Sequence, residues 1–215
     1  MEKVNNREAI GVVDRMIDVI RENKQYLSDI DGAIGDGDHG INMNKGFSMA
    51  REELERDPGD LSHGLTVLSK VLMMRIGGSM GPLYGKIFKA MGKTFRDQEQ
   101  IDADLFGDAL TRVKVEMEAL SPARIGDKTL VDALFPAIDA YGQTLDEGGS
   151  FADSLAAMKQ AAEAGRDATE GMVAKIGRSS RLGERSRGVI DAGAASCALL
   201  LGAMAETLTG LLSPD

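Results

Sequence analysis

The sequence is poor in cysteine, aromatic residues and positive charge, and each shortage excludes a class of protein. Its one cysteine, Cys197, excludes an intramolecular disulfide and a cysteine zinc site. Aromatic residues make up 4% of the chain and include no Trp, which disfavours a base-stacking surface. The 25 basic residues face 34 acidic ones, and a net charge of −9 offers no basic field to a nucleic acid or an anionic membrane. We therefore expect no nucleic-acid and no membrane partner.

Long apolar runs are also missing. The longest, 193–205, has 13 residues, fewer than a membrane-spanning helix needs. The first residues, MEKVNNREAIG, lack the apolar run of a secretory signal. With 43% hydrophobic and 27% charged residues, the chain is typical of globular proteins. Its length fits one domain, and we expect a single domain over residues 1–215 in the reducing cytoplasm.

Apolar residues recur at helical spacing along nearly the whole chain. Ile10, Val13, Ile17 and Ile20 step by three and four residues, and later segments repeat this spacing. No alternating strand pattern is visible, and glycine- and proline-rich breakers separate the periodic segments. Short connections favour antiparallel neighbours. The pattern predicts an all-α fold, an up-and-down bundle or closed barrel of about eight helices, roughly at 5–27, 39–56, 60–76, 81–96, 102–120, 128–146, 150–175 and 192–211.

Three aspartates lie among glycines in the segment 31–44, DGAIGDGDHGINMN. The carboxylates of Asp31, Asp36 and Asp38 repel one another at this spacing unless a cation lies between them. Carboxylate oxygens are ligands of hard cations, and Mg²⁺ is usually held by a few carboxylates together with substrate phosphates. The alternative is a helix start, with Asp38 as the N-cap and the glycines as a loop. The two interpretations are compatible.

Two more glycine-rich turns come before helices. The turn 77–82, GGSMGP, places Pro82 in the first turn of the next helix, where free amides can bind an anion; an ordinary turn is the alternative. The turn 126–129, GDKT, opens another helix with Asp127 as its expected cap.

Arginines gather in the segment 177–193, ahead of a helix that opens at Asp191. In an otherwise acidic chain they suit phosphate recognition, and a solvated loop or a docking surface for an acidic partner is the alternative. The four are Arg178, Arg181, Arg185 and Arg187.

Together, four motifs resemble the nucleotide-binding L subunit (DhaL) of dihydroxyacetone kinase. They are GDGDHG at 35–40, GGSMGPLYG at 77–85, GDKTLVDAL at 126–134 and GRSSRLGERSRGVIDAGAAS at 177–196. Their order and spacing match that family, and the resemblance extends from about residue 9 to 211. It implies a closed barrel of eight antiparallel helices, in agreement with the apolar spacing.

The resemblance also implies a site. Asp31, Asp36 and Asp38 would hold two Mg²⁺ ions that bridge the phosphates of ADP or ATP, and with Arg178 they are the expected catalytic residues. Met80 stands where many members carry a hydroxyl residue, and Ala192 where many carry proline. The implied nucleotide-binding residues are His39, Gly40, Ile41, Asn42, Ser79, Met80, Gly126, Leu130, Arg178, Asp191, Ala192 and Gly193.

The implied reaction needs partners. In the family a separate K subunit holds the ketose, dihydroxyacetone, and receives the phosphoryl group from the nucleotide. The expected donor is a phosphohistidine-carrying M subunit of the sugar phosphotransferase system. Three alternatives stay open: an ATP-dependent kinase of another small ketose such as a tetrose, an ADP-loaded module that binds a transcription regulator, and a structural protein whose acidic loop binds Ca²⁺ or nothing.

Overall fold

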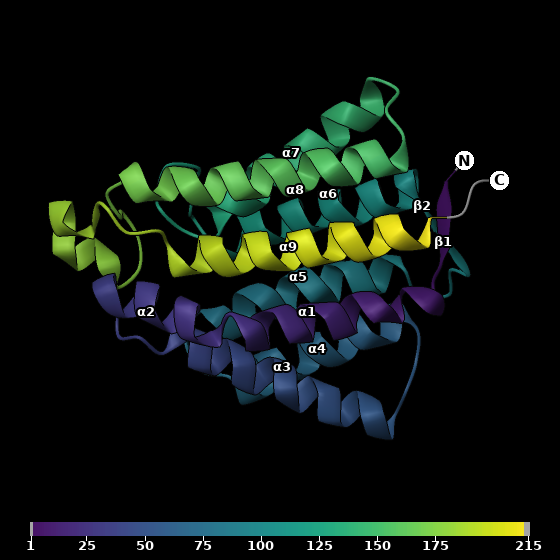
Figure 1. Cartoon of the computed structure of the whole chain (residues 1–215), viewed down its shortest axis with the longest axis horizontal. Coiled ribbons are helices and arrows are strands. Elements are labelled where there is room, and N and C mark those ends of the chain that lie inside the picture. Colours follow the sequence, from purple (N-terminus) through teal and green to yellow (C-terminus); the bar gives the residue numbers. More distant parts are fainter. Residues whose placement is uncertain (1, 213–215) are drawn as a thin grey trace.

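The protein is described by a computed structural model that covers residues 2–212. Within these residues nine α-helices run along one common axis (Figure 1). They are α1 (Gly11–Glu22), α2 (Lys24–Ile34), α3 (His39–Arg56), α4 (Leu61–Arg75), α5 (Met80–Thr94), α6 (Ala103–Leu120), α7 (Val131–Asp146), α8 (Phe151–Ala168) and α9 (Ala192–Leu211).

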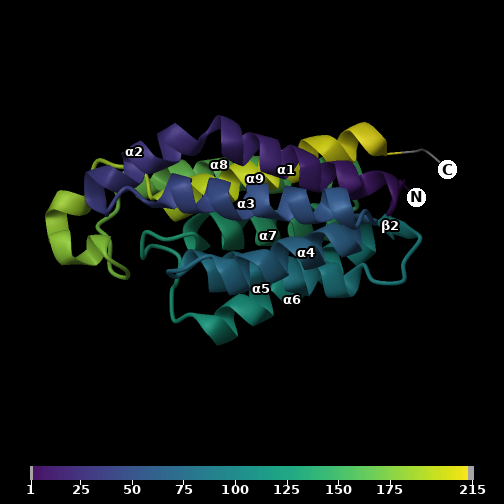
Figure 2. The ribbon, with the colours of Figure 1, turned by 90° about the horizontal axis from the view of Figure 1, so that it is seen from below.

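The helices close into a ring in chain order. Each of the helices from α3 to α9 packs on the next, and α9 packs back on α1, which lies beside α3 (Figures 1 and 2). The predicted first helix is in fact two, α1 and α2, because the chain bends at Asn23 (φ −101°, ψ 9°). The Asn23 side-chain amide donates to the Val19 carbonyl at 2.8 Å and so ends α1. Counted as one bent unit, α1 and α2 bring the ring to the predicted eight, and the all-α class is confirmed.

A short pair of strands was not predicted. β1 (Lys3–Asn5) and β2 (Gln100–Asp102) pair antiparallel, with Val4 opposite Ile101, and both of these side chains are fully buried. Three residues are too few to produce a visible alternation. The strands lie at one end of the barrel (Figure 1). Two 3₁₀ turns, η2 (Thr169–Gly171) and η3 (Ser179–Ser186), lie in the other half of the molecule. η3 contacts α2 and projects past the ends of the helices (Figures 1 and 2).

The last helix forms much of the barrel's interior. α9 has 20 residues, and by length and composition it could cross a membrane. The apolar segment is therefore longer than the 13-residue run read from the sequence. Most of it is nevertheless buried against α1, α7 and α8, as in the core helix of a globular protein. Alanines are frequent in the first half of α9, and Ala194, Ala195 and Ala198 are buried there.

Candidate functional site

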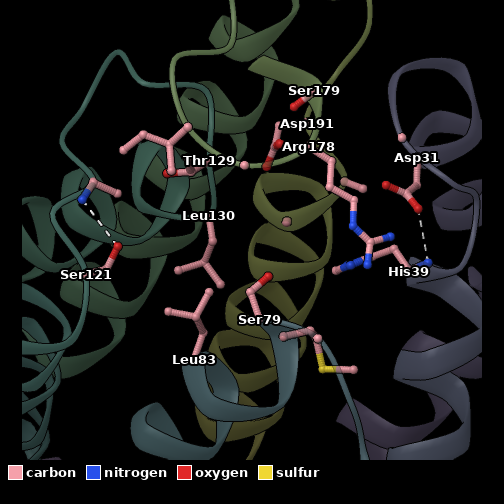
Figure 3. Close-up of a pocket in the computed structure, with 18 of the residues that line it drawn as sticks. Asp31, His39, Ser79, Leu83, Ser121, Thr129, Leu130, Arg178, Ser179 and Asp191 are labelled. Carbon is pink, nitrogen blue, oxygen red and sulfur yellow. Dashed lines mark hydrogen bonds between the residues drawn. The ribbon is translucent and has the colours of Figure 1, made fainter. Parts of the chain in front are cut away.

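A cavity of about 970 Å³ opens at the end of the barrel that carries η3. Its walls come from the α2–α3 turn, the α4–α5 turn, the start of α7 and the segment before α9 (Figure 3). These are the four motifs that the sequence singled out. Segments more than 150 residues apart therefore meet around one space.

The acidic residues converge because of the turn that joins α2 to α3. Asp31 lies in the last turn of α2, whereas Asp36 and Asp38 lie in the turn itself. Gly37 has a φ of +74°, which a residue with a side chain rarely adopts, and it reverses the chain between the two turn aspartates. A Cβ at Gly35 would lie 2.6 Å from an Asp31 carboxylate oxygen. As a result, one oxygen from each carboxylate lies within 4.8 Å of the other two.

The predicted capping role of Asp38 is wrong. Asp38 occupies the N-cap position of α3 but its side chain accepts no capping hydrogen bond. The Asp31 carboxylate instead accepts from the His39 amide at 3.2 Å (Figure 3). The carboxylates of Asp36 and Asp38 are exposed and add nothing to the helix start, so helix capping does not account for them.

The three carboxylates fit a hard divalent cation. An octahedral Mg²⁺ with oxygen ligands at about 2.1 Å keeps those oxygens within about 4.2 Å of one another. The three oxygens already lie within 4.8 Å, and every ligand residue of the cluster is an aspartate. The donor set is therefore all carboxylate, which Mg²⁺ prefers to nitrogen or sulfur.

His39 is held by a buried chain of hydroxyl groups. Its Nε2 lies 2.9 Å from the Ser196 Oγ, which lies 2.6 Å from the Tyr84 hydroxyl. The Tyr84 hydroxyl also donates to the Gly193 carbonyl at 3.3 Å. Burial lowers the pKa of His39, and the charge of Asp31 opposes this shift. The sequence did not point to Tyr84 or Ser196, which come from α5 and α9.

The opposite wall of the cavity is apolar. Leu83 and Leu130 face the space from α5 and from the start of α7, across from Asp31 and His39 (Figure 3). Ser79 lies between the two sides, at the N-cap position of α5, and makes no capping hydrogen bond. Pro82 is the third residue of α5, so its predicted place in the first turn is confirmed. The cavity is thus charged on one side and apolar on the other.

Residues 169–191, here called the cover segment, connect α8 to α9 and close one side of the cavity. Arg178 reaches across toward the side of Asp31 and forms an ion pair with Asp36 (Figure 3). Arg181 also lines the cavity. Arg187 instead pairs with Glu184 at 3.2 Å and donates to the Gly171 carbonyl, and Arg185 lies outside the lining. Two of the four arginines therefore face the cavity.

Lys128 is buried beneath the cover segment. Its side chain is 1% exposed, and its Nζ donates to four backbone carbonyls, those of Thr169, Met172, Ser186 and Val189. Burial lowers the pKa of Lys128, which the charge of Asp191 opposes. The sequence placed Lys128 within a motif but gave no reason to expect a buried ammonium group.

The predicted cap Asp127 is wrong, because the N-cap residue of α7 is Leu130 and no side chain makes a capping hydrogen bond there; Asp132 instead holds the preceding turn. The Asp132 carboxylate accepts from the amides of Gly126 and Thr129, at 2.5 and 2.7 Å. Asp127 accepts from the Arg124 amide at 2.7 Å, one turn earlier. The spacing Thr129-x-x-Asp132 resembles a capping box and is the signal that could have identified this contact.

Asp191 is the cap of α9, as expected. Its carboxylate accepts from the Ala194 amide at 2.8 Å, and Ala192 and Gly193 line the cavity beside it. Burial raises the pKa of Asp191 to about 6, only partly offset by that hydrogen bond.

Known proteins are similar to this chain in sequence and in fold. The family model of the DAK2 domain matches residues 33–206. The ADP-binding subunit DhaL of a PEP-dependent dihydroxyacetone kinase from Listeria innocua is 38% identical over 189 residues, 87% of this chain and 89% of the relative. An L-erythrulose kinase from Pectobacterium atrosepticum is 34% identical over 89% of this chain, which spans 33% of that enzyme.

Solved structures agree. The dihydroxyacetone kinase of C. freundii matches with a TM-score of 0.70 and 25% identity, over 92% of this chain and 34% of that one. The complex of that enzyme with AMP-PNP and Mg²⁺ shares the fold at a TM-score of 0.65. This chain belongs to the DhaL family.

Among the residues expected from the DhaL resemblance, twelve line the cavity and three do not. Gly40 is buried where α3 crosses α2, and a Cβ there would overlap the Lys24 carbonyl. Ile41 points outward and is 51% exposed. The Gly126 amide is taken by Asp132. The twelve are Asp31, Asp36, Asp38, His39, Asn42, Ser79, Met80, Leu130, Arg178, Asp191, Ala192 and Gly193.

The two departures from the common DhaL pattern, Met80 and Ala192, are both buried residues of the cavity lining. Met80 lines the cavity but is 8% exposed, so it offers an apolar surface where a hydroxyl is frequent. The hydroxyl of neighbouring Ser79 is exposed and lines the same wall. Ala192, in place of proline, is the first residue of α9, where either residue is compatible with a helix start.

Proposed function

We propose that this chain is the nucleotide-binding L subunit of a dihydroxyacetone kinase. It would bind ADP or ATP with Mg²⁺ and transfer a phosphoryl group to the ketose held by a separate K subunit. The donor would be a phosphohistidine-carrying M subunit of the phosphotransferase system. The convergence of three carboxylates and one arginine at the mouth of a nucleotide-sized cavity is the observation that carries this proposal. We place the protein in the cytoplasm, where Cys197 stays reduced.

The carboxylates of Asp31, Asp36 and Asp38 would hold two Mg²⁺ ions. Bound there, the ions supply positive charge that binds the nucleotide phosphates and neutralises the charge that develops during phosphoryl transfer. Without them, a nucleotide would meet three carboxylates in a chain of net charge −9 and be repelled.

The remaining residues position the nucleotide. Arg178 extends over the acidic side, where its guanidinium can donate to phosphate oxygens. His39 is held by Ser196, so it would offer the nucleotide a hydrogen-bond partner in a fixed position. Leu83 and Leu130 form the apolar wall against which a purine base can pack. The K subunit would bind the ketose and would supply the general base that accepts the proton of its hydroxyl group.

A second candidate substrate is a small tetrose. The similarity to an L-erythrulose kinase favours it, and the nucleotide half of the reaction would be unchanged because the ketose is bound elsewhere. The ketose-binding partner would then decide between the two substrates.

Native mass spectrometry of the purified protein, followed by a transfer assay, tests the proposal. We expect ADP with two Mg²⁺ on the protein. Mixed with the K and M subunits and phosphoenolpyruvate, it should form dihydroxyacetone phosphate, and Asp36→Ala should abolish product formation. A protein that holds no nucleotide under any Mg²⁺ concentration would refute the proposal. Product formed from erythrulose alone would favour the second candidate.

A further inference from the structure

Lys128 joins the two ends of the cover segment through one ammonium group. Thr169 and Met172 lie at its beginning, and Ser186 and Val189 lie near its end. The Nζ to carbonyl distances are 2.5 Å to Val189, 2.7 Å to Ser186, 2.8 Å to Thr169 and 3.2 Å to Met172. An ammonium has three protons, and the three shortest contacts take one each. Both ends of the segment are represented among these three.

This arrangement is costly and therefore calls for a reason. Burying an ammonium removes its hydration, and among the described residues Lys128 forms no ion pair that would offset the loss. Its backbone also has a φ of +62°, a region that residues with a side chain seldom adopt. Strained backbone and buried charge at one residue are typical of positions that hold a functional segment in place.

Other contacts at the same point act in the same direction. The Gly188 amide donates to the Glu170 carbonyl at 2.8 Å, and the Ser186 hydroxyl accepts from the Ala174 amide at 2.9 Å. The residues between these contacts carry Arg178 and Arg181, which line the cavity. The same part of the segment includes η3, which contacts α2. The position of Arg178 therefore depends on how firmly the base of the cover segment is closed.

We propose that Lys128 is a positioning residue that closes the base of the cover segment and thereby sets how long a nucleotide stays in the cavity. The second half of this inference rests on the proposed function. Lys128 lines the cavity, but its Nζ is directed to backbone carbonyls of the cover segment and is not offered to the cavity. Its loss should free the segment, so that a bound nucleotide leaves faster.

The first test needs no nucleotide. Trypsin cuts after arginine, and the cover segment carries several exposed arginines. We expect Lys128→Met to be cut after Arg181 and Arg185 at least about tenfold faster than the wild type, as expected for the loss of buried charged hydrogen bonds. The matched control is Lys175→Met, because Lys175 lies in the same segment but is 64% exposed and pairs only with Asp127, at 3.4 Å. It should be cut after Arg181 and Arg185 at the wild-type rate, although it loses the trypsin site at residue 175.

The second test measures release of mant-ADP in the presence of Mg²⁺. We expect about tenfold faster dissociation from Lys128→Met and no change in Lys175→Met. Lys128→Ala provides a readout that a purely structural role would not give. Methylammonium can place its own ammonium among the four freed carbonyls, so it should restore slow release. Tetramethylammonium at the same ionic strength has no N–H donor and should not.

The outcomes separate the two proposals. Equal cleavage and equal mant-ADP release in Lys128→Met and wild type would overturn the role of Lys128. Rescue by both cations alike would also overturn it, because a general salt effect would then be responsible. A wild type that binds no mant-ADP contradicts the proposed function, while the cleavage rates still decide on Lys128. If circular dichroism shows that Lys128→Met is unfolded, Ser186→Ala loosens the same base and should show the same changes at smaller size.

Discussion

Asp191 is a carboxyl group whose burial competes with its hydrogen bond at the start of α9. Its pKa of about 6 in the folded protein lies above the ordinary value of 3.8. Folding therefore takes up a proton between about pH 4 and pH 6, and the contribution of Asp191 to stability falls as the pH rises through this range. Above pH 6 the buried charge lowers stability by up to about 3 kcal/mol.

Asp191→Asn should remove this dependence. Asparagine caps a helix as well as aspartate does but carries no charge. We expect the free energy of unfolding of Asp191→Asn, relative to the wild type, to increase from pH 4 to pH 6 and then to stay constant. Urea unfolding at several pH values measures the difference, in which the titration of His39 and other groups cancels. A difference that is independent of pH would show that the Asp191 carboxyl is not perturbed by burial.

Single residues of the site differ in how well the sequence predicts them. Asp31, Asp36 and Asp38 are close in sequence, and the glycines between them made their convergence predictable. The contacts of Lys128, Tyr84 and Ser196 join residues 41 to 112 positions apart. Such contacts depend on the arrangement of helices, which apolar spacing alone does not specify.

At the scale of elements, the crossing of α2 and α3 holds the acidic turn in shape. Gly40 lies at that crossing, and a Cβ there would overlap the Lys24 carbonyl and approach the Ser28 backbone amide at 2.8 Å. The two helices could then not approach as closely. Gly40, which the family resemblance implies as a nucleotide-binding residue, therefore lies where two helices pack closely.

We expect Gly40→Ala to destabilise the protein by about 1–3 kcal/mol through overpacking and to weaken Mg²⁺-dependent ADP binding. The matched control is Gly142→Ala, because Gly142 lies inside α7 with open space around its Cα. That substitution should stabilise the protein by about 0.5–1 kcal/mol, since alanine favours the helix. Denaturant unfolding compares the two. Stabilisation by both substitutions would contradict the close packing of α2 and α3.

Element boundaries show the limits of local signals. Asn23 divides the first helix although the apolar spacing continues through it, because a side-chain hydrogen bond to Val19 ends α1. Asp31–Ile34 belong to α2 although glycines surround them. The strands β1 and β2 form because two segments far apart in the sequence pair at one end of the barrel, and each alone is too short to be recognised.

For the whole molecule, ligand binding and folding are linked. The cavity is built from four separate segments, which are together only in the folded chain. A nucleotide that binds there stabilises the folded state by about 2.7 kcal/mol when its concentration is 100-fold above Kd. For a chain of 215 residues this raises the Tm by roughly 5–10 °C.

We therefore expect ADP with Mg²⁺ to raise the Tm of the protein, once freed of bound nucleotide, by that amount, and ADP with EDTA or Mg²⁺ alone to raise it much less. Differential scanning fluorimetry measures the three conditions. An equal shift with ADP in EDTA would mean that the carboxylates bind no metal in the complex.

The barrel itself was predictable because most helices of the ring carry an apolar stripe and α9 is apolar around most of its surface. The cavity was predictable only through the order of its motifs, since nothing in the periodicity shows that four turns gather at one end. The part-buried His39 and the buried Lys128 are consequences of that gathering, since burial lowers the pKa of both. The sequence alone gives such residues no distinctive neighbours.

The central claim is that the three carboxylates bind a nucleotide through shared divalent cations. Calorimetric titration of the Asp38→Asn variant with ADP in the presence of Mg²⁺ tests this claim most directly. Asp38 is exposed and makes no capping hydrogen bond, so the variant should fold like the wild type. We expect its affinity for ADP to fall at least about tenfold, whereas Asp29→Asn, on the neighbouring surface of α2, should bind like the wild type. Equal Mg²⁺-dependent binding by Asp38→Asn, Asp29→Asn and the wild type would contradict the claim.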